Sequence, residues 1–518
     1  MTTQNYVEFK DKRKKKSAQF IENIENYRVA IVGIGALIML LGSLIIGLTD
    51  LGIVAVIGAG GIGFVMAILA RPYLGMYVLT LFIFTNLSTV LNEAFGIPSL
   101  NKILVALIFV AVIGTRVVMQ KKPLLFRVSE GAIMLYVIVT SVSTIISAGS
   151  MGDSFNSILD VVKDFVIIII IVQLATEESA WKNAQWVLIA SAVILSMMTW
   201  FQFFTGNFDM DFYGLATSRS DSVQGDFSTY IDFMRVGGPV GDPNFYAQIL
   251  VMVMPLAIYR FLTDPVKINR VFGAIAILLI GGAIIFTYSR ATLVVMIAVI
   301  GLIMLERRIP IYKIVVGGTL VLALTFPLLP ESFKARMFTI VGIDTSSAQQ
   351  EDVSTQGRLS EALVAMQMFQ DYPIFGIGYS QYEPNYQSYS VFIGLDQRIE
   401  ERQAHNLYLE VAAETGILGV TALAIMLFFI YRAAMDTRRA LHELKREDLI
   451  PWAAAFHFAL LAYLINSIFL HDDYARYLRL MIGFVVSGTA MTGALKIKMD
   501  AERLRSTINL SKNQHLLK

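Results

Sequence analysis

The stretch NLYLEVAAETGILGVTALAIMLFFIY, residues 406–431, decides the fold class of this chain. It is almost entirely apolar, and its two charged residues are Glu410 and Glu414. An α-helix of about 20 apolar residues is long enough to cross the hydrocarbon core of a bilayer. The stretch therefore predicts a transmembrane helix. Carboxylates inside such a helix are costly and normally face a partner or an aqueous cavity, so the two glutamates require an explanation.

The same apolar pattern recurs along the whole chain. Of the 518 residues, 56% are hydrophobic and 16% are charged, whereas a soluble domain is nearer 25% charged. We predict an all-α polytopic membrane protein with about 14 transmembrane helices. The expected spans are 29–48, 52–70, 73–91, 102–119, 131–148, 161–175, 183–204, 244–262, 271–288, 291–305, 311–329, 406–431, 451–470 and 476–495.

These spans divide the chain into seven segments. They are a basic N-terminal segment (1–28), an N-terminal transmembrane bundle (29–204), a loop (205–243), a second group of helices (244–329), a large loop (330–405), the C-terminal helices (406–495) and a tail (496–518). Within the large loop, Leu359, Leu363 and Met366 fall on one helical stripe, and Pro373 follows. We expect a short amphipathic helix there, lying at the membrane surface.

The orientation follows from the distribution of basic residues. With a cytoplasmic N-terminus, thirty of the 42 Lys and Arg residues fall on the cytoplasmic side, as the positive-inside rule requires. Both termini are then cytoplasmic, and both long loops are extracytoplasmic. The run KDKRKKK, residues 10–16, is typical of an anchor to anionic lipid, and we favour this over nucleic-acid binding.

His405 is the first candidate for chemistry. It lies where the large loop meets the helix at 406–431, beside Asn406, a residue type favoured as a helix N-cap. The positive end of a helix disfavours a protonated histidine, so a neutral imidazole there can act as a general base. Asn406, Glu410 and Glu414 share one helix face. The alternative is an interfacial histidine with two glutamates that extend towards water, and the spacing alone does not decide between the two.

Gly416 and Gly419 in the same stretch predict the close approach of a neighbouring helix.

Arginines supply the second set of candidates. On the expected outer side, arginine outnumbers lysine nine to three, and arginine binds phosphate with a planar, bidentate group. Arg290 follows Ser289 in TYSR (287–290), at the outer junction of two spans. Arg358 opens the loop helix, and helix N-termini favour anions. Structural pairing with carboxylates is the alternative for each arginine.

Two further clusters are less specific. In RVGGPVGDPN, residues 235–244, the side chains of Arg235, Asp242 and Asn244 could touch a ligand, but a plain helix entrance explains them as well and is favoured. In HDDYARYLR, residues 471–479, the first three residues are better explained by local pairing with arginine than by a metal site.

The chain has no cysteine, so thiolate metal sites are excluded. It also lacks a phosphate-binding P-loop motif.

Together these motifs resemble those of the O-antigen ligases and O-antigen polymerases of bacterial surface-polysaccharide assembly. The family's His-Asn, nine residues and Gly-x-x-Gly are matched without departure by residues 405–419. Its Thr-x-Ser-Arg is matched by TYSR, and its Gly-Arg by Gly357 and Arg358. YPIFGIG (372–378) matches a further motif, with Tyr372 where the family often has His. GDPN (241–244) is a looser match, and the resemblance covers roughly residues 235–432.

The resemblance implies a C-type glycosyltransferase-like fold in the bacterial cytoplasmic (inner) membrane, with the active site on the extracytoplasmic side. The expected reaction moves a glycan from a polyprenyl diphosphate carrier to an acceptor hydroxyl, with inversion and without metal or cofactor. The acceptor would be a lipid such as lipid A core, or a growing polysaccharide. His405 would be the catalytic base and Arg290 and Arg358 would hold the diphosphate. Asn406, Glu410, Arg235, Asp242, Asn244 and Ser289 would be supporting residues.

Two questions stay open at this level. Ligases and polymerases share these motifs, so the sequence does not separate them. The other alternative is a transporter or flippase for the same lipid-linked glycan. Such a protein would carry basic residues at mid-membrane and inverted repeats. In this chain the notable charges gather at the outer boundary and no repeat is visible, which favours the transferase.

Overall fold

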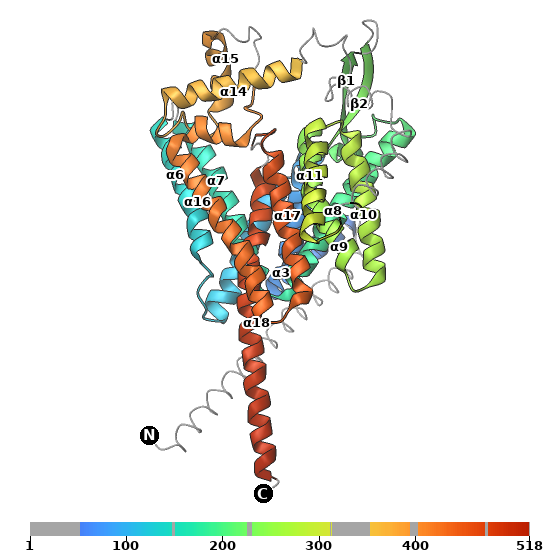
Figure 1. Cartoon of the computed structure of the whole chain (residues 1–518), viewed down its shortest axis with the longest axis vertical. Coiled ribbons are helices and arrows are strands. Elements are labelled where there is room, and N and C mark those ends of the chain that lie inside the picture. The colour runs from blue at the N-terminus through green and yellow to red at the C-terminus, as the bar shows by residue number, and fades with distance from the viewer. Residues whose placement is uncertain are drawn as a thin grey trace. The chain divides into compact units, whose positions relative to one another are not determined.

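The structure is a computed structural model that describes residues 52–147, 151–224, 230–310, 312, 353–393, 402–471 and 475–516. The expected span at 29–48 lies outside these residues, and of the span expected at 311–329 only residue 312 is described. The described part is mostly helical, with one β-hairpin (Figure 1).

The chain divides into two compact units. The first comprises residues 1–79 and 100–124, and the second comprises residues 80–99 and 125–518. The described helices of the first unit are α2 (Gly52–Ala70), most of α3 (Pro72–Phe84), α5 (Leu100–Val112) and the π-helix η1 (Ile113–Met119).

The second unit contains every segment that carries an expected site residue. Its elements are α4 (Leu87–Phe95), α6 (Val128–Ser147), α7 (Met151–Leu174), α8 (Glu178–Thr205), η2 (Phe212–Gly214), β1 (Thr217–Gln224), β2 (Tyr230–Gly238), α9 (Pro243–Thr263), α10 (Lys267–Phe286), α11 (Arg290–Glu306), α14 (Val353–Asp371), α15 (Tyr382–Ile393), α16 (Leu407–Glu443), η5 (Glu447–Leu449), α17 (Ile450–Asn466) and α18 (Ala475–Leu516).

Within the described residues, eight helices are long and apolar enough to cross a membrane, or nine if the pair α3 and α4, bent by 65°, forms one span. The predicted membrane-helical class is therefore supported, but the predicted number of about 14 is not confirmed. Two of the expected spans are not among these helices. α11 is short, with 17 residues, and α7 carries Asp160, Lys163 and Asp164 within its length.

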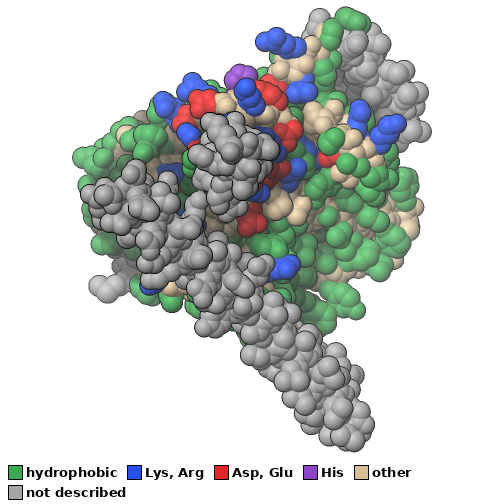
Figure 2. Space-filling model, turned by 90° about the horizontal axis from the view of Figure 1, so that it is seen from below, with side chains coloured by type: hydrophobic (Ala, Val, Ile, Leu, Met, Phe, Trp, Pro, Cys, Tyr) green, Lys and Arg blue, Asp and Glu red, His purple; other side chains and the backbone are tan. Residues whose placement is uncertain are grey.

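α9 is the most completely buried of the described candidate spans, and it packs against α8, α10, α11 and α17. Its residues from Phe245 to Arg260 are all buried. In contrast, α6 and α10 expose leucine, isoleucine and valine side chains, as helices that face lipid do. Seen from the end that bears the α18 tail, hydrophobic side chains cover the flanks, and the acidic and basic side chains gather between them (Figure 2).

The loop at 205–243 contains an antiparallel hairpin that the all-α prediction missed. β1 pairs with β2 from Thr217 opposite Gly238 to Gln224 opposite Tyr230. The sequence of β1, TSRSDSVQ, alternates serine with mostly polar residues and has no apolar face. The alternation of apolar and polar residues that identifies a half-buried strand is therefore absent.

The large loop contains the helix α14. The helix begins at Val353, and the predicted stripe of Leu359, Leu363 and Met366 is exposed, at 62%, 37% and 52%. The opposite face is buried within the protein, and it includes Glu361. α14, α15 and the hairpin all lie at the end of the second unit opposite the C-terminal end of α18 (Figure 1).

The helix expected at 406–431 is broken at Gly416, where φ is 62° and ψ is −163°. The YPIFGIG segment fits into the break. Ile377 N donates to Ala413 O (3.0 Å), and Ile417 N donates to Pro373 O (2.9 Å). The break leaves backbone groups of the helix without intrahelical partners, and these bonds satisfy some of them.

The glycines of the two motifs permit this backbone crossing. A Cβ on Gly416 would lie 2.4 Å from Ile374 O, and a Cβ on Gly376 would lie 2.2 Å from the carbonyl carbon of Glu414. The partner of Gly416 is therefore the turn of the YPIFGIG segment and not the neighbouring helix that was expected. Gly419 accommodates the Thr415 side chain of its own helix. His-Asn-x9-Gly-x-x-Gly and YPIFGIG are thus two halves of one structural element.

Candidate functional site

The turn after α17, residues 466–470, joins the segments that carry the expected site. From α11, Thr292 Oγ1 donates to Asn466 Oδ1 (3.1 Å). From α9, Gln248 Nε2 donates to Ser467 Oγ (3.0 Å). Because these side chains are buried, the starts of α9 and α11 are held together at one end of the bundle.

The start of α16 is fixed to the same turn. Leu407 N donates to Ser467 O (3.0 Å) and to Leu470 O (2.9 Å). Asn406 is the N-cap of α16, and its Oδ1 accepts from Tyr408 N and Leu409 N. The Asn406 Nδ2 donates to Ile468 O (3.0 Å). Asn406 therefore positions the residue before it.

That residue is His405, which adopts a left-handed backbone conformation with φ of 45°. Its Nδ1 lies 3.1 Å from Gln403 O and 3.1 Å from Glu361 Oε2. A carbonyl and a carboxylate both accept hydrogen bonds and donate none, so Nδ1 carries the proton of the neutral ring. The lone pair is then on Nε2. His405 has the geometry of a general base that acts through Nε2.

The protonation of His405 is set by competing effects. Burial alone lowers the pKa of His405, and the nearby positive charge of Arg358 also lowers it. The hydrogen bond and the negative charge of Glu361, together with the Gln403 carbonyl, raise it and outweigh the other effects. The pKa of His405 therefore lies above 6.5.

Sequence reasoning missed Glu361. It lies one helical turn after Arg358 on α14, and its side chain is 4% exposed. Its Oε1 accepts from Arg402 Nη1 (3.2 Å). The available signal was a carboxylate on the helix face opposite the apolar stripe. The stripe of Leu and Met residues, however, indicates that the other face is the one that packs.

The two predicted phosphate-binding arginines are half-buried in the second unit. Arg358 is close enough for its charge to act on His405. Arg290 is the first residue of α11 and follows Ser289, the N-cap of that helix. Arg290 and His405 are linked through the chain of contacts from Thr292 to Asn466 and from Ser467 to Leu407.

Arg235 is instead part of the internal framework. It is 3% exposed. Its guanidinium donates to Thr287 O (2.9 Å), Asp221 Oδ2 (3.2 Å) and Asn244 Oδ1 (3.1 Å). It therefore ties together the hairpin, the TYSR turn and the start of α9.

Asp242 is the N-cap of α9, and its Oδ1 accepts from Asn244 N (2.7 Å) and Phe245 N (3.1 Å). It also pairs with Arg219 (3.2 Å). These contacts support the interpretation of the GDPN segment as a helix entrance.

The two glutamates of α16 are both buried. Glu414 Oε1 accepts from Tyr382 N (3.1 Å), the first residue of α15. Glu414 O accepts from Ser143 Oγ and from Gly378 N, both at 2.9 Å. Glu414 therefore holds α6, α15 and the YPIFGIG segment together. Glu410 is near Tyr382, where burial and the surrounding carboxylates raise the pKa of the tyrosine hydroxyl.

His471 is a second residue that the sequence did not place in the site. It is 3% exposed, and its ring centroid is 5.3 Å from that of His405, in an edge-to-face arrangement. Asp472 and Asp473 lie outside the described residues. Among the residues that are described, no group of three or more His, Asp or Glu side chains is placed to hold a metal ion.

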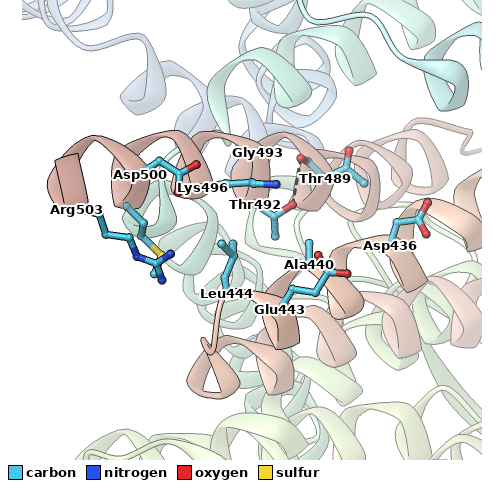
Figure 3. A pocket seen from close by; sticks show the side chains of 11 residues that line it. Asp436, Ala440, Glu443, Leu444, Thr489, Thr492, Gly493, Lys496, Asp500 and Arg503 are labelled. Carbon is cyan, nitrogen blue, oxygen red and sulfur yellow. Dashed lines mark hydrogen bonds between the residues drawn. The ribbon is translucent and has the colours of Figure 1, made fainter.

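A cavity of about 410 Å³ lies between α16 and α18 near the opposite end of the unit (Figure 3). Its lining mixes both signs of charge, with Asp436, Glu443, Lys496 and Arg503. It includes none of the expected site residues, and it is roughly 45 Å from His405 along the path of α16. The cavity is therefore separate from the candidate site.

Comparison with known families agrees with the motifs. Residues 275–424 match the model of the O-antigen ligase family. The matched region includes TYSR, the Gly-Arg pair, YPIFGIG and the whole of His-Asn-x9-Gly-x-x-Gly. No curated protein matches the chain. The match confirms the resemblance to the O-antigen ligase family.

Proposed function

We propose that the protein is an integral membrane glycosyltransferase, because residues 275–424 match the O-antigen ligase family and the chain has helices long and apolar enough to cross a membrane. It moves a glycan from a polyprenyl diphosphate carrier to an acceptor hydroxyl on a lipid, a growing polysaccharide or a similar molecule. It works in the bacterial cytoplasmic membrane, with both termini cytoplasmic and His405 on the extracytoplasmic side.

The reaction requires one base and one anion-binding group. The acceptor oxygen attacks the anomeric carbon of the donor sugar as its proton passes to Nε2 of His405. The bond between the anomeric carbon and the phosphate oxygen breaks, and its electron pair stays on the polyprenyl diphosphate. Attack from the face opposite the leaving group inverts the anomeric centre. The diphosphate ester is already activated, so no nucleotide is consumed.

The arginines stabilise the charge that develops on the leaving diphosphate. Arg358, beside His405, and Arg290, at the start of α11, are the residues for this role. Because fixed guanidinium groups supply the positive charge, the transfer needs no metal ion.

The observation that carries the proposal is the placement of His405. Its side chain is 32% exposed, while the Glu361 carboxylate behind it is 4% exposed. The imidazole is therefore partly open to an acceptor, whereas its counter-ion is shielded from water. Asn406 and the turn after α17 fix this arrangement. A flippase makes no covalent bond and therefore requires no general base.

The bias of Lys and Arg residues supports the extracytoplasmic side. The exposed stripe of Leu359, Leu363 and Met366 on α14 is consistent with a helix at the membrane surface, next to the site. A site at this level meets both a membrane-bound carrier and an acceptor that approaches from water.

The test uses a deletion strain complemented with His405→Ala, Arg290→Ala or Arg358→Ala, and the lipid-linked glycan is measured on each leaflet. We expect carrier-bound glycan to accumulate on the outer leaflet. The matched control is Arg219→Ala, an exposed arginine of the hairpin, which retains transfer. Accumulation on the inner leaflet would identify a flippase instead. Full transfer by His405→Ala would exclude the general-base role.

The product distinguishes ligase from polymerase. Loss of a polymerase leaves single repeat units on the final acceptor, whereas loss of a ligase leaves long chains on the carrier. Both outcomes are compatible with the site as described, because both reactions need the same base and the same arginines.

A further inference from the structure

We propose that Glu361 is a positioning residue for His405, which holds the imidazole in the tautomer that leaves Nε2 free, and that Arg402 fixes the Glu361 carboxylate for this task. The inference rests on the proposed function and adds two residues to it. Neither residue belongs to the motifs that identified the site.

The first argument is the geometry of the three side chains. Glu361 Oε2 lies 3.1 Å from His405 Nδ1, and Glu361 Oε1 lies 3.2 Å from Arg402 Nη1. Each carboxylate oxygen thus faces a different partner. A Cβ on Gly357 would lie 2.6 Å from Arg402 Nη1 and would displace the guanidinium from Glu361. The glycine of the Gly-Arg pair therefore leaves the space that this arrangement needs.

The second argument is the rigidity of Glu361. Its carbonyl oxygen accepts from the hydroxyl of Tyr382 (2.7 Å), and Tyr382 N donates to Glu414 Oε1 (3.1 Å). Val364 and Ala365, on the same helix, lie in one buried cluster with Tyr382. α14, α15 and α16 therefore hold the carboxylate in place before any substrate binds.

The third argument is the state of Glu361 Oε2. This oxygen is buried, and the Nδ1 group that it faces at 3.1 Å is shared with Gln403 O. When Nε2 takes a proton, the ring becomes positively charged 3.1 Å from a negatively charged oxygen. Glu361 therefore interacts more strongly with His405 after proton transfer than before it. Interactions that strengthen towards the transition state accelerate a reaction.

The charges around His405 determine whether a substitution raises or lowers the pKa of the imidazole. Charged and titratable groups near His405 are Glu361 and Arg358 on α14 and His471 after α17, and Arg402, on the segment of His405 itself, pairs with Glu361. Replacing Glu361 by glutamine removes the negative charge at Nδ1, so the pKa of His405 falls. Replacing Arg402 by glutamine removes a positive charge that competes for Glu361, so the pKa of His405 rises.

The test is nuclear magnetic resonance of the full chain in lipid nanodiscs, with the histidines labelled with nitrogen-15. The chain has five histidines, and the His405 signal is assigned by its loss in His405→Gln. We expect the neutral ring to carry its proton on Nδ1. We expect the pKa of His405 to fall in Glu361→Gln and to rise in Arg402→Gln.

Glu383→Gln is the matched control. Glu383 accepts from the side chain of Gln403, which is two residues before His405. The variant therefore makes the same change of carboxylate to amide at a group that does not contact the imidazole, and the pKa of His405 stays as it is. An unchanged pKa in Glu361→Gln, or a proton on Nε2 in the native protein, overturns the inference. If Glu361→Gln does not fold, Arg402→Gln decides, and an unchanged or lowered pKa in that variant overturns it.

Transfer activity separates this inference from the proposed function. Glu361→Gln is expected to lose about 10- to 100-fold in rate, part of the 10²- to 10⁴-fold that a general base contributes. Glu361→Asp, which keeps the charge, is expected to recover part of the loss. If the pKa shifts occur but His405→Ala still transfers glycan at the native rate, the general-base role fails, while the coupling of Glu361 to His405 stands.

Discussion

Replacing Gly416 by alanine tests the backbone crossing that shapes the site. Residue 416 has φ of 62° and ψ of −163°, a conformation that is essentially restricted to glycine. An added Cβ would lie 2.4 Å from Ile374 O, 2.5 Å from Ile374 C and 2.8 Å from Gly376 N. All three neighbours are backbone atoms, so no side-chain rotation relieves the overlap.

The expected cost combines two effects. A backbone conformation that is unfavourable for alanine costs about 1–3 kcal/mol, and overpacking against fixed atoms costs about 1–3 kcal/mol more. We therefore expect Gly416→Ala to lower the free energy of unfolding by about 2–6 kcal/mol. The displaced YPIFGIG segment would also shift α14, and with it Glu361, so transfer should fall as well.

The assay is thermal unfolding of the purified protein in detergent. Gly301→Ala, in the interior of α11, is the matched control, because a Cβ there would meet no atom within 4 Å. Alanine in a helix is favoured over glycine by about 0.5–1 kcal/mol, so the control should unfold at or above the native temperature. If Gly416→Ala unfolds together with the control, the crossing does not constrain the fold and the reasoning is wrong.

Three other predictions follow from the same contacts. Because His405 has to be neutral to accept a proton and its pKa is raised above 6.5, kcat/KM should be constant above that pKa and fall tenfold per pH unit below it. A pH–rate profile that is flat through this region would contradict the assignment. Arg235→Ala should destabilise the protein by about 1–3 kcal/mol, because Thr287 O and Asn244 Oδ1 would lose the hydrogen bonds of the buried guanidinium, and thermal unfolding measures this. A metal chelator should leave the rate of transfer unchanged, and a loss that added divalent ions restore would show that a metal takes part.

The sequence predicts the membrane-helical class well, because long apolar runs have few alternatives. It is less informative wherever the structure depends on contacts between distant segments. The apolar pattern continues through Gly416, so periodicity indicates one helix where the structure has a break. The break is recognisable only together with residues 372–378, which fill it.

The candidate site also combines residues that local sequence identifies with residues that only tertiary contacts identify. His405, Arg290 and Arg358 are recognisable because each occurs in a short local motif. Glu361 is 44 residues before His405, and nothing in its neighbourhood marks it as the partner of a histidine. The fold of α14 against α16 brings the two together. Arg235, in contrast, was a ligand candidate by its position, and the structure gives it three internal partners.

The two glutamates of the opening stretch also depend on tertiary structure. Glu414 is tolerated in the apolar run because it binds the backbone of Tyr382 at the start of α15. The first turns of α16, before the break, therefore pack against the elements of the large loop and not against lipid. The free-energy cost of placing a carboxylate in lipid is therefore reduced for Glu414.

The most direct test of the central claim is the release of polyprenyl diphosphate by the purified protein in liposomes that contain a polyprenyl diphosphate-linked glycan and an acceptor. The native protein should release one polyprenyl diphosphate for each glycoside formed, with the anomeric centre inverted. His405→Ala should lower the rate by about 10²- to 10⁴-fold. Release at the native rate by His405→Ala, or no release by the native protein while glycan crosses the bilayer, would contradict the account.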